Sequence, residues 1–329
     1  MKYQKIVNNK VQCQLCPREC LLANGQSGFC YVRKNVKNNL LLETYGFNTG
    51  IAIDPVEKKP LYHFYPSSKV LSFGTLGCNM DCQFCQNWQT TKVKYPIEQC
   101  PSAAPEQIVK TAKEYGCKSV AFTYNEPIIF FEYAIETAKL CRKAGIKTIA
   151  VTSGYINPEP AKDFFAVMDA ANIDLKGFSK EFYAKNCHAE LEPILNTIKY
   201  AVKETKCFVE LTTMLIEGEN DQFVEKECKW IIENLGDSIP IHFSAFFPKY
   251  NFKDKEPTKA ETLKNAYNTA KKMGLKYVYT GNIPDKETSI TYCKECGKPI
   301  IKRDGYSVIA NNVKDGLCKF CGTKCDGEF

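Results

Sequence analysis

The sequence predicts an α/β protein in which short parallel strands, curled into a full or partial barrel, alternate with helices. Between residues 70 and 280, apolar runs rich in Val, Ile, Phe and Thr alternate with longer segments of helical character. Several helical segments have Pro near the start and Gly at the stop, such as Pro127 and Gly145. The chain has 329 residues, 44% of them hydrophobic, which is ample for a core.

The expected elements follow one another in regular order. We expect strands at 70–76, 118–124, 147–152, 171–175, 207–213, 240–245 and 276–280. We expect helices at 105–116, 127–144, 158–166, 189–205, 221–235 and 257–273. Strands linked through helices run parallel, so their C-terminal ends meet at one edge, where barrel enzymes keep their chemistry. The sequence has no Walker loop and no Gly-x-Gly-x-x-Gly, so nucleotide binding of the usual kinds is not supported.

A four-cysteine group precedes the predicted barrel. Its spacing is C-x2-C-x3-C-x9-C, and four thiolates complete a coordination sphere. We interpret this group as a structural zinc site or an auxiliary iron-sulfur cluster, because both use these ligands and the choice depends on geometry. The residues are Cys13, Cys16, Cys20 and Cys30.

A second four-cysteine group follows the barrel, with the spacing C-x2-C-x21-C-x2-C and a glycine after each pair. Two such knuckles are typical of a four-thiolate zinc ribbon, and so small a module needs the metal to fold. The ligands would be Cys293, Cys296, Cys318 and Cys321. We therefore divide the chain into an N-terminal extension at 1–69, a barrel at 70–288 and a zinc ribbon at 289–329.

The loop after the first barrel strand contains Cys78, Cys82 and Cys85, spaced C-x3-C-x2-C. Iron-sulfur clusters usually take four cysteines, so a set of three leaves one iron free to bind a cofactor or substrate. The alternatives are a zinc loop whose fourth ligand lies elsewhere, or three unligated thiols. The usual two-plus-two spacing of zinc ligands is absent from this loop.

This motif, with Phe84 immediately before the third cysteine, resembles the signature of the radical S-adenosylmethionine (SAM) enzymes. The resemblance implies that the three cysteines hold a 4Fe-4S cluster whose fourth iron binds the amine and carboxylate of SAM. It also implies an electron donor of the flavodoxin or ferredoxin kind. One electron then cleaves SAM to a 5'-deoxyadenosyl radical, which abstracts hydrogen from a substrate.

Further segments extend the resemblance over nearly the whole chain. FTYNEP, VTSGY, NIDLKGF, VELTTMLIEGEND, FSAFFPKY and YVYTGNIPDKE look like the radical-SAM member of the AmmeMemoRadiSam system, which is related to pyruvate formate-lyase activating enzymes. The superfamily's Gly-Gly-Glu motif would correspond to Tyr124, Asn125 and Glu126, so Glu126 is retained and both glycines are replaced. The cofactor contacts that the resemblance implies are Phe84, through its backbone against adenine, and Asn125, Glu126, Ser153 and Asp174.

Three basic residues lie shortly before the cysteine strand. Lys58, Lys59 and His63 are placed where they could meet an anionic cofactor or substrate, although a solvated turn is the simpler interpretation. Where an activating enzyme has an acidic residue before its third-strand motif, this chain has Val151, which argues against a bridging cation there.

Composition points to a cytoplasmic protein of a reducing, anaerobic setting. The first residues have no apolar segment of the secretory kind, and no apolar run reaches the ~18 residues that cross a membrane. Eighteen cysteines without such a signal favour metal binding over disulfides. The net charge of +7 is mild for this length and gives little support for a nucleic-acid partner.

We therefore expect a radical SAM oxidoreductase, similar to glycyl-radical activating enzymes, that acts on an unidentified protein or small-molecule substrate. The alternative is a nucleic-acid-binding or RNA-modifying protein that grips its partner with the zinc ribbon. A third interpretation is a non-catalytic scaffold stabilised by metal. Formation of 5'-deoxyadenosine from SAM separates the first interpretation from the other two.

Overall fold

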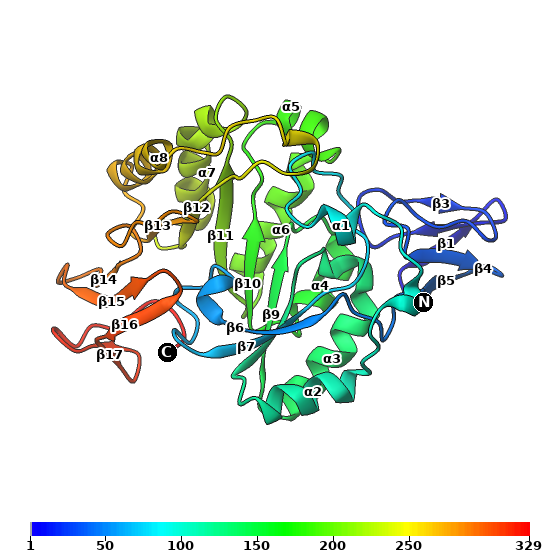
Figure 1. Cartoon of the computed structure of the whole chain (residues 1–329), viewed down its shortest axis with the longest axis horizontal. Helices are drawn as coiled ribbons and strands as arrows, with labels where there is room; N and C mark the ends of the chain where they lie inside the picture. The colour runs from blue at the N-terminus through cyan, green and yellow to red at the C-terminus, as the bar shows by residue number, and fades with distance from the viewer. Residues whose placement is uncertain (1) are drawn as a thin grey trace.

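An eight-stranded sheet forms the centre of the computed structural model, which describes residues 2–329 (Figure 1). Strands β7 to β13 pair in chain order and are all parallel, and β6 adds an antiparallel edge beside β7. The strands are β6 (Ile51–Pro55), β7 (Lys69–Phe73), β8 (Ser119–Phe122), β9 (Lys147–Thr152), β10 (Ala170–Asp174), β11 (Phe208–Leu215), β12 (Ile241–Ala245) and β13 (Val278–Gly281).

Helices connect the parallel strands, as the alternation predicts. Each expected helix is present, and the one at 127–144 begins with a 3-10 turn at Pro127–Phe130. The helices are α2 (Pro105–Glu114), α3 (Phe131–Lys143), α4 (Pro158–Phe165), α6 (Leu191–Glu204), α7 (Val224–Leu235) and α8 (Ala260–Lys272), with short α1 (Trp88–Thr91) and α5 (Lys180–Phe182) near the cysteine loop. The predicted α/β fold with a mostly parallel sheet is thus confirmed. Its edge strands β6 and β13 are not paired with each other in residues 2–329, so the sheet is open there.

One face of each helix supplies the core. In α3, Tyr133, Ala134, Thr137, Ala138 and Cys141 are buried, which is the three-to-four-residue spacing of a helix face packed on a sheet. Cys141 is fully buried there and packs as a small core residue. None of the helices in the described part of the chain is long and apolar enough to span a bilayer.

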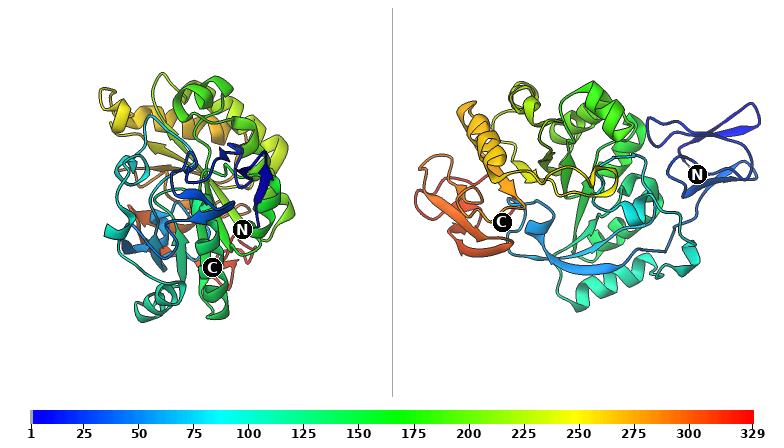
Figure 2. Two further views of the ribbon diagram at one scale, coloured as in Figure 1. Left: turned by 90° about the vertical axis from the view of Figure 1, so that its right-hand side faces the viewer. Right: turned by 45° about the horizontal axis from the view of Figure 1, so that its top comes forward.

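The two cysteine-rich ends lie on opposite sides of the sheet (Figure 2). The N-terminal lobe contains β1 (Gln4–Val7), β2 (Lys10–Cys13), β3 (Leu21–Leu22) and the hairpin of β4 (Arg33–Val36) and β5 (Asn39–Leu42). The C-terminal lobe contains β14 (Thr291–Tyr292), β15 (Pro299–Asp304), β16 (Ser307–Asn311), β17 (Val313–Lys314) and β18 (Leu317–Cys318). Because β6 pairs with β7, the central sheet begins at Ile51, ahead of the boundary that we placed at residue 70.

The segment between β6 and β7 is largely buried. Val56, Leu61 and Phe64 pack with the first residues of neighbouring strands, among them Val70 on β7 and Ala170 on β10. The segment therefore covers the N-terminal ends of the parallel strands. A solvated turn is consequently the wrong interpretation for Lys59 and His63, which are 3% and 1% exposed.

Candidate active site

A cavity of about 330 Å³ opens at the C-terminal ends of the parallel strands. This is the edge at which α/β enzymes of this architecture bind their ligands. The three cysteines of the loop after β7 line the cavity, together with residues from the ends of β8 to β12. Its wall includes Cys78, Cys82, Cys85, Phe84, Asn125, Glu126, Ser153, Asp174, Lys176 and Ser244.

Two glycines allow the cysteine loop to take its path. A Cβ on Gly74 would lie 2.2 Å from the carbonyl oxygen of Thr123, so no larger residue fits beside the end of β8. Gly77 has φ +87°, and a Cβ on it would lie 2.4 Å from the carbonyl oxygen of Cys30. The loop is therefore wedged between β8 and the N-terminal lobe.

The side chain of Asn125 holds the start of this loop. Its Oδ1 accepts a hydrogen bond from the backbone N of Thr75 at 3.0 Å, and its Nδ2 donates to the carbonyl oxygen of Gly77 at 3.0 Å. Because these contacts occupy the Asn125 amide, a contact of this residue with a cofactor would come from its backbone. The sequence alone did not indicate this positioning role.

The neighbouring residue Tyr124 has φ +69°, in the left-handed region that favours glycine. This is the position at which the family resemblance places a glycine. The Asn87 side chain donates to the Tyr124 carbonyl oxygen at 2.6 Å, which helps to hold the turn. The chain thus keeps the backbone shape of a glycine turn with a larger residue.

Glu126, at the end of the same turn, is buried among donors. It accepts hydrogen bonds from the backbone N of Ser153 at 2.7 Å, from Ser153 Oγ at 2.6 Å and from Thr152 Oγ1 at 2.5 Å. Burial raises the pKa of Glu126, and these bonds partly oppose that effect. The ends of β8 and β9 are thereby tied together at the cavity wall.

Lys92 lies beside the three cysteines, although the sequence analysis did not single it out. Its ammonium group is 3.3 Å from Asp81 Oδ1 and also donates to the carbonyl oxygen of Met80. Burial alone would lower the pKa of Lys92, but the attraction of the Cys78, Cys82 and Cys85 thiols raises it. A largely buried cation facing three thiols suits an anionic iron-sulfur cluster.

The thiols themselves favour a cluster over a single ion. Burial raises the pKa of Cys78 to about 12, whereas a hydrogen bond with Cys187 lowers that of Cys82. In residues 2–329, the set of metal-ligating side chains whose ligand atoms all lie within 4.8 Å of one another is at the C-terminus and does not include these three. Their wider spacing fits three corner irons of a 4Fe-4S cluster better than a single zinc ion.

Three ion pairs, one at Asp174 and two at Asp54, lie at the polar wall. Lys176 Nζ lies 2.6 Å from Asp174 Oδ2, and this attraction raises the pKa of Lys176 against the effect of burial. Asp54 contacts Lys58 at 2.9 Å and Lys59 at 2.8 Å. Burial alone would raise the pKa of Asp54, but the two lysines lower it to about 2. Both lysines nevertheless line the cavity, whose wall extends to the segment after β6, and Lys59 Nζ lies 4.9 Å from the centre of the Tyr124 ring.

The structure brings all five expected cofactor residues to this cavity: Phe84, Asn125, Glu126, Ser153 and Asp174. The centre of the Phe84 ring lies 5.8 Å from that of Phe182 and 5.9 Å from that of Phe252. Val151 also lines the wall. His63 lies at the opposite end of the sheet, where Nε2 is 2.6 Å from the hydroxyl of Tyr279.

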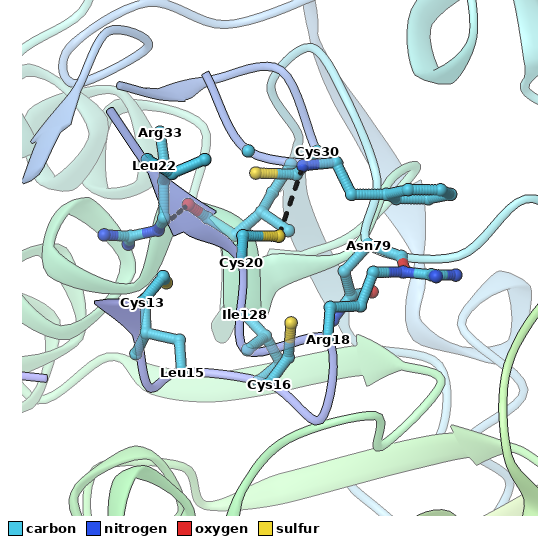
Figure 3. A pocket seen from close by; sticks show the side chains of 13 residues that line it. Cys13, Leu15, Cys16, Arg18, Cys20, Leu22, Cys30, Arg33, Asn79 and Ile128 are labelled. Atoms are coloured by element: carbon cyan, nitrogen blue, oxygen red, sulfur yellow. Dashed lines mark hydrogen bonds between the residues drawn. The ribbon is translucent and has the colours of Figure 1, made fainter. Parts of the chain in front are cut away.

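The two four-cysteine groups have different geometries. At the C-terminus all four sulfurs lie within 4.8 Å of one another, with 3.6 Å between Cys293 and Cys321 and 3.9 Å between Cys296 and Cys318. The N-terminal Cys13, Cys16, Cys20 and Cys30 instead line a separate cavity (Figure 3). The C-terminal group fits one tetrahedrally coordinated metal ion.

These features define an α/β protein with a three-cysteine cluster site at the C-terminal edge of its sheet. The family model described as the radical SAM superfamily matches residues 73–231, and the chain belongs to this superfamily. Membership implies a 4Fe-4S cluster and SAM as cofactors, and the cysteine loop, the cavity and the nearby cation fit them.

The similar relatives include one archaeal protein and one bacterial enzyme. An uncharacterized protein of Methanocaldococcus jannaschii is 41% identical over 332 residues, which cover 99% of this chain and 98% of that protein. The pyruvate formate-lyase-activating enzyme of Listeria monocytogenes is 24% identical over 132 residues, 38% of this chain and 53% of that enzyme. Among solved structures, Streptococcus suis SuiB bound to precursor peptide SuiA matches with a TM-score of 0.50 and 16% identity, over 69% of this chain and 51% of that one, which shows the fold alone.

Proposed function

We propose that this protein cleaves SAM reductively and uses the product to abstract a hydrogen atom from a polypeptide substrate. The observation that carries the proposal is the C-x3-C-x2-C loop facing a cavity that also contains Glu126 and Asp174. A 4Fe-4S cluster at Cys78, Cys82 and Cys85, with SAM bound, would supply one-electron cleavage of a C–S bond.

The residues of the chain would bind and orient the cofactor. Glu126 and Ser153, joined by hydrogen bonds at the ends of β8 and β9, would bind the methionyl amine. Asp174 and Lys176 would bind polar atoms of the ribose and the methionyl carboxylate. Lys92 would offset the negative charge of the thiolate-bound cluster and so favour its reduction.

The choice of a polypeptide substrate rests on the relatives and on the surroundings of the cavity. The Listeria relative is named for the activation of an enzyme, which makes its substrate a protein. Near the cysteine loop, the Trp88 ring stacks on Tyr250 at 5.8 Å, and Phe247 is 47% exposed. Aromatic groups of this kind are common at protein-binding surfaces. An external electron donor of the flavodoxin or ferredoxin type would complete the system.

The test is whether the anaerobically reconstituted chain, given a reductant, converts SAM to 5'-deoxyadenosine. Uncoupled cleavage without substrate is the expected result. No 5'-deoxyadenosine from a chain that contains its full iron content would overturn the proposal. Deuterium transfer into 5'-deoxyadenosine from deuterated cell protein, but not from deuterated small metabolites, would then support a polypeptide substrate.

We also propose that the C-terminal lobe is a zinc ribbon whose metal site is distinct from the catalytic site. The short sulfur distances support one tetrahedral ion, and Gly297 and Gly322 follow the two cysteine pairs with φ of +67° and +76°. Changing Cys296 and Cys321 to Ser in the full chain should remove about one zinc per chain, the content of one four-thiolate site, and no iron. Iron lost with these cysteines would contradict the zinc assignment.

A further inference from the structure

The N-terminal lobe contains a second cavity whose wall includes all four of its clustered cysteines. Figure 3 shows Cys13, Cys16, Cys20 and Cys30 placed around this space. Cys13 ends β2, and Cys30 comes three residues before β4. The remaining wall is mostly apolar, with Leu15, Leu22, Phe29, Ile128 and Ile129 among its residues.

The spacing of the four sulfurs distinguishes this cavity from the C-terminal ribbon. In the part of the chain that the structure describes, the ribbon cysteines form a set with all sulfurs within 4.8 Å, and the N-terminal four do not. Zn–S bonds of about 2.3 Å bring the four sulfurs of a zinc site close together. A cubane iron-sulfur cluster places an inorganic core between its thiolates and needs them farther apart. The three cysteines of the catalytic loop hold such a cluster in this superfamily. Among the described residues, their sulfur atoms likewise do not form a set within 4.8 Å of one another.

The surroundings of the cavity suit an anionic cluster. The backbone N of Phe29 donates to Cys20 Sγ at 3.4 Å, a kind of contact that tunes cluster potentials. Arg33 is 2% exposed, donates from Nε to the carbonyl oxygen of Ile129 at 2.9 Å and pairs with Glu132 at 2.5 Å. The Arg18 guanidinium lies 3.5 Å from the centre of the Phe29 ring. Two cations thus border a cavity lined by four thiols.

The N-terminal cavity and the catalytic cavity share the same segments of chain as a common wall. Asn79 lines the N-terminal cavity, whereas its sequence neighbours Cys78 and Met80 line the catalytic cavity. Ile128 and Ile129 likewise line the N-terminal cavity, and Asn125 and Glu126 line the catalytic cavity. The two cavities therefore lie back to back across the cysteine loop.

Direct contacts join the two sites. The carbonyl oxygen of Cys30 is packed against Gly77, the residue before the first catalytic cysteine. Arg18 Nε donates to the carbonyl oxygen of Asn79 at 2.6 Å. Electron tunnelling weakens steeply with distance, so two redox groups on either side of one peptide segment are well placed to exchange electrons.

We propose that Cys13, Cys16, Cys20 and Cys30 hold a second 4Fe-4S cluster, which relays electrons to the catalytic cluster. Cys16 and Cys20 are partly exposed and offer a point of entry for an external donor of the flavodoxin or ferredoxin class. That donor gives one electron to the N-terminal cluster, which changes from the 2+ to the 1+ state. The cluster returns to 2+ when the electron passes to the catalytic cluster, and that electron cleaves the C–S bond of SAM. The relay role rests on the proposed function; the cluster assignment does not.

Iron content tests the cluster without any need for SAM cleavage. A full-length chain with Cys78, Cys82 and Cys85 all changed to Ala should keep about four irons and an EPR signal on reduction, as one remaining 4Fe-4S cluster requires. Further changes Cys16→Ala and Cys20→Ala should remove this iron, whereas Cys141→Ala and Cys228→Ala, at buried thiols away from both cavities, should not. A three-alanine chain with no iron and an additional zinc would overturn the assignment.

The choice of reductant tests the relay. With the catalytic cysteines intact, Cys16→Ala and Cys20→Ala should abolish SAM cleavage driven by a reduced flavodoxin or ferredoxin, while cleavage driven by dithionite, a small reductant, persists. Cleavage at the parent rate with the protein donor would overturn the relay. Loss with both reductants would overturn it as well, because it would show that the lobe only supports the fold of the catalytic loop.

Discussion

The two ends of the parallel sheet both bury ionisable side chains but arrange them differently. At the C-terminal end, Glu126, Asp174 and Lys176 line a cavity of about 330 Å³. At the N-terminal end, Glu210 accepts a hydrogen bond from the backbone N of His63 at 2.8 Å, and its other oxygen lies 2.6 Å from His242 Nε2. Both ends pair their charged groups within the protein, but at the first end the paired groups line a cavity and at the second they are buried against the protein.

The C-terminal lobe completes the pairing at the N-terminal end. His63 Nδ1 lies 2.7 Å from the carbonyl oxygen of Asp326, so Nδ1 carries the proton and Nε2 accepts from the hydroxyl of Tyr279. Arg303 of β15 donates to the carbonyl oxygen of Tyr62 at 2.7 Å, and its Nε lies 3.9 Å from Glu57 Oε1. Buried charge by itself therefore does not mark a functional site; buried charge beside a cavity does.

The largest effect on activity is expected from substitutions in the cysteine loop. Changing any one of Cys78, Cys82 or Cys85 to Ala should abolish formation of 5'-deoxyadenosine, because a cluster held by two thiolates is not expected to persist. Product chromatography and iron content check this, with Cys141→Ala as a control at a buried thiol on α3. Parent-rate cleavage by any of the three variants would refute the assignment of the active site.

The next effect concerns the N-terminal end of the sheet and changes stability rather than chemistry. Arg303→Met should lower the free energy of unfolding by about 3–5 kcal/mol, because it leaves a buried carboxylate without its partner. Urea unfolding of the full chain measures this. Lys302→Met, at the exposed neighbouring position, is the control and should change little. An Arg303 variant as stable as the parent would mean that this contact contributes little to docking of the lobe.

A smaller effect is expected from the carboxylate at the cavity. Glu126→Gln should raise the SAM concentration needed for activity by about ten- to a hundredfold, because a bond to a charged group contributes about 1.5–3 kcal/mol. Iron content should stay unchanged. Equilibrium binding of SAM to the reconstituted protein gives the measurement, and Glu114→Gln on the exposed face of α2 is the control. Loss of iron in the Glu126 variant would instead point to a role in folding or cluster assembly.

The smallest effect is a dependence of stability on pH. Burial lowers the pKa of His63 below its ordinary 6.5, and the pKa of Glu210 is also lowered, since contact with His242 outweighs burial there. Below pH 6.5 the imidazole of His63 is therefore protonated in the unfolded chain but not in the folded one, whereas Glu210 acts in the same direction only below its ordinary pKa of 4.5. The contribution of His63 to the free energy of unfolding should fall as the pH decreases below 6.5, by up to about 1.4 kcal/mol per pH unit.

Unfolding measured between pH 7.5 and pH 5.5 at constant metal content checks this dependence. His63→Gln should flatten the slope, whereas His188→Gln, at a half-exposed side chain, should leave it nearly unchanged. An identical slope in the parent and the His63 variant would show that other groups control the acid sensitivity.

The sequence by itself determined the alternation of strands and helices and the position of the catalytic loop. Both follow from local patterns: apolar runs of strand length, prolines and glycines at helix ends, and three cysteines within eight residues. The same reasoning assigned Glu126, Ser153 and Asp174 to one site, because parallel strands place their C-terminal ends at one edge.

Only the tertiary structure decided which charges meet. Lys92 faces the cysteines because the loop folds back on itself, and Arg303 reaches Tyr62 across 241 positions of the chain. The sequence spacing of the N-terminal four cysteines likewise did not distinguish a zinc ion from an iron-sulfur cluster. The choice depends on the distances between the sulfur atoms, and the order of ligands along the chain does not specify these distances. Contacts between distant segments depend on packing, and no local pattern encodes them.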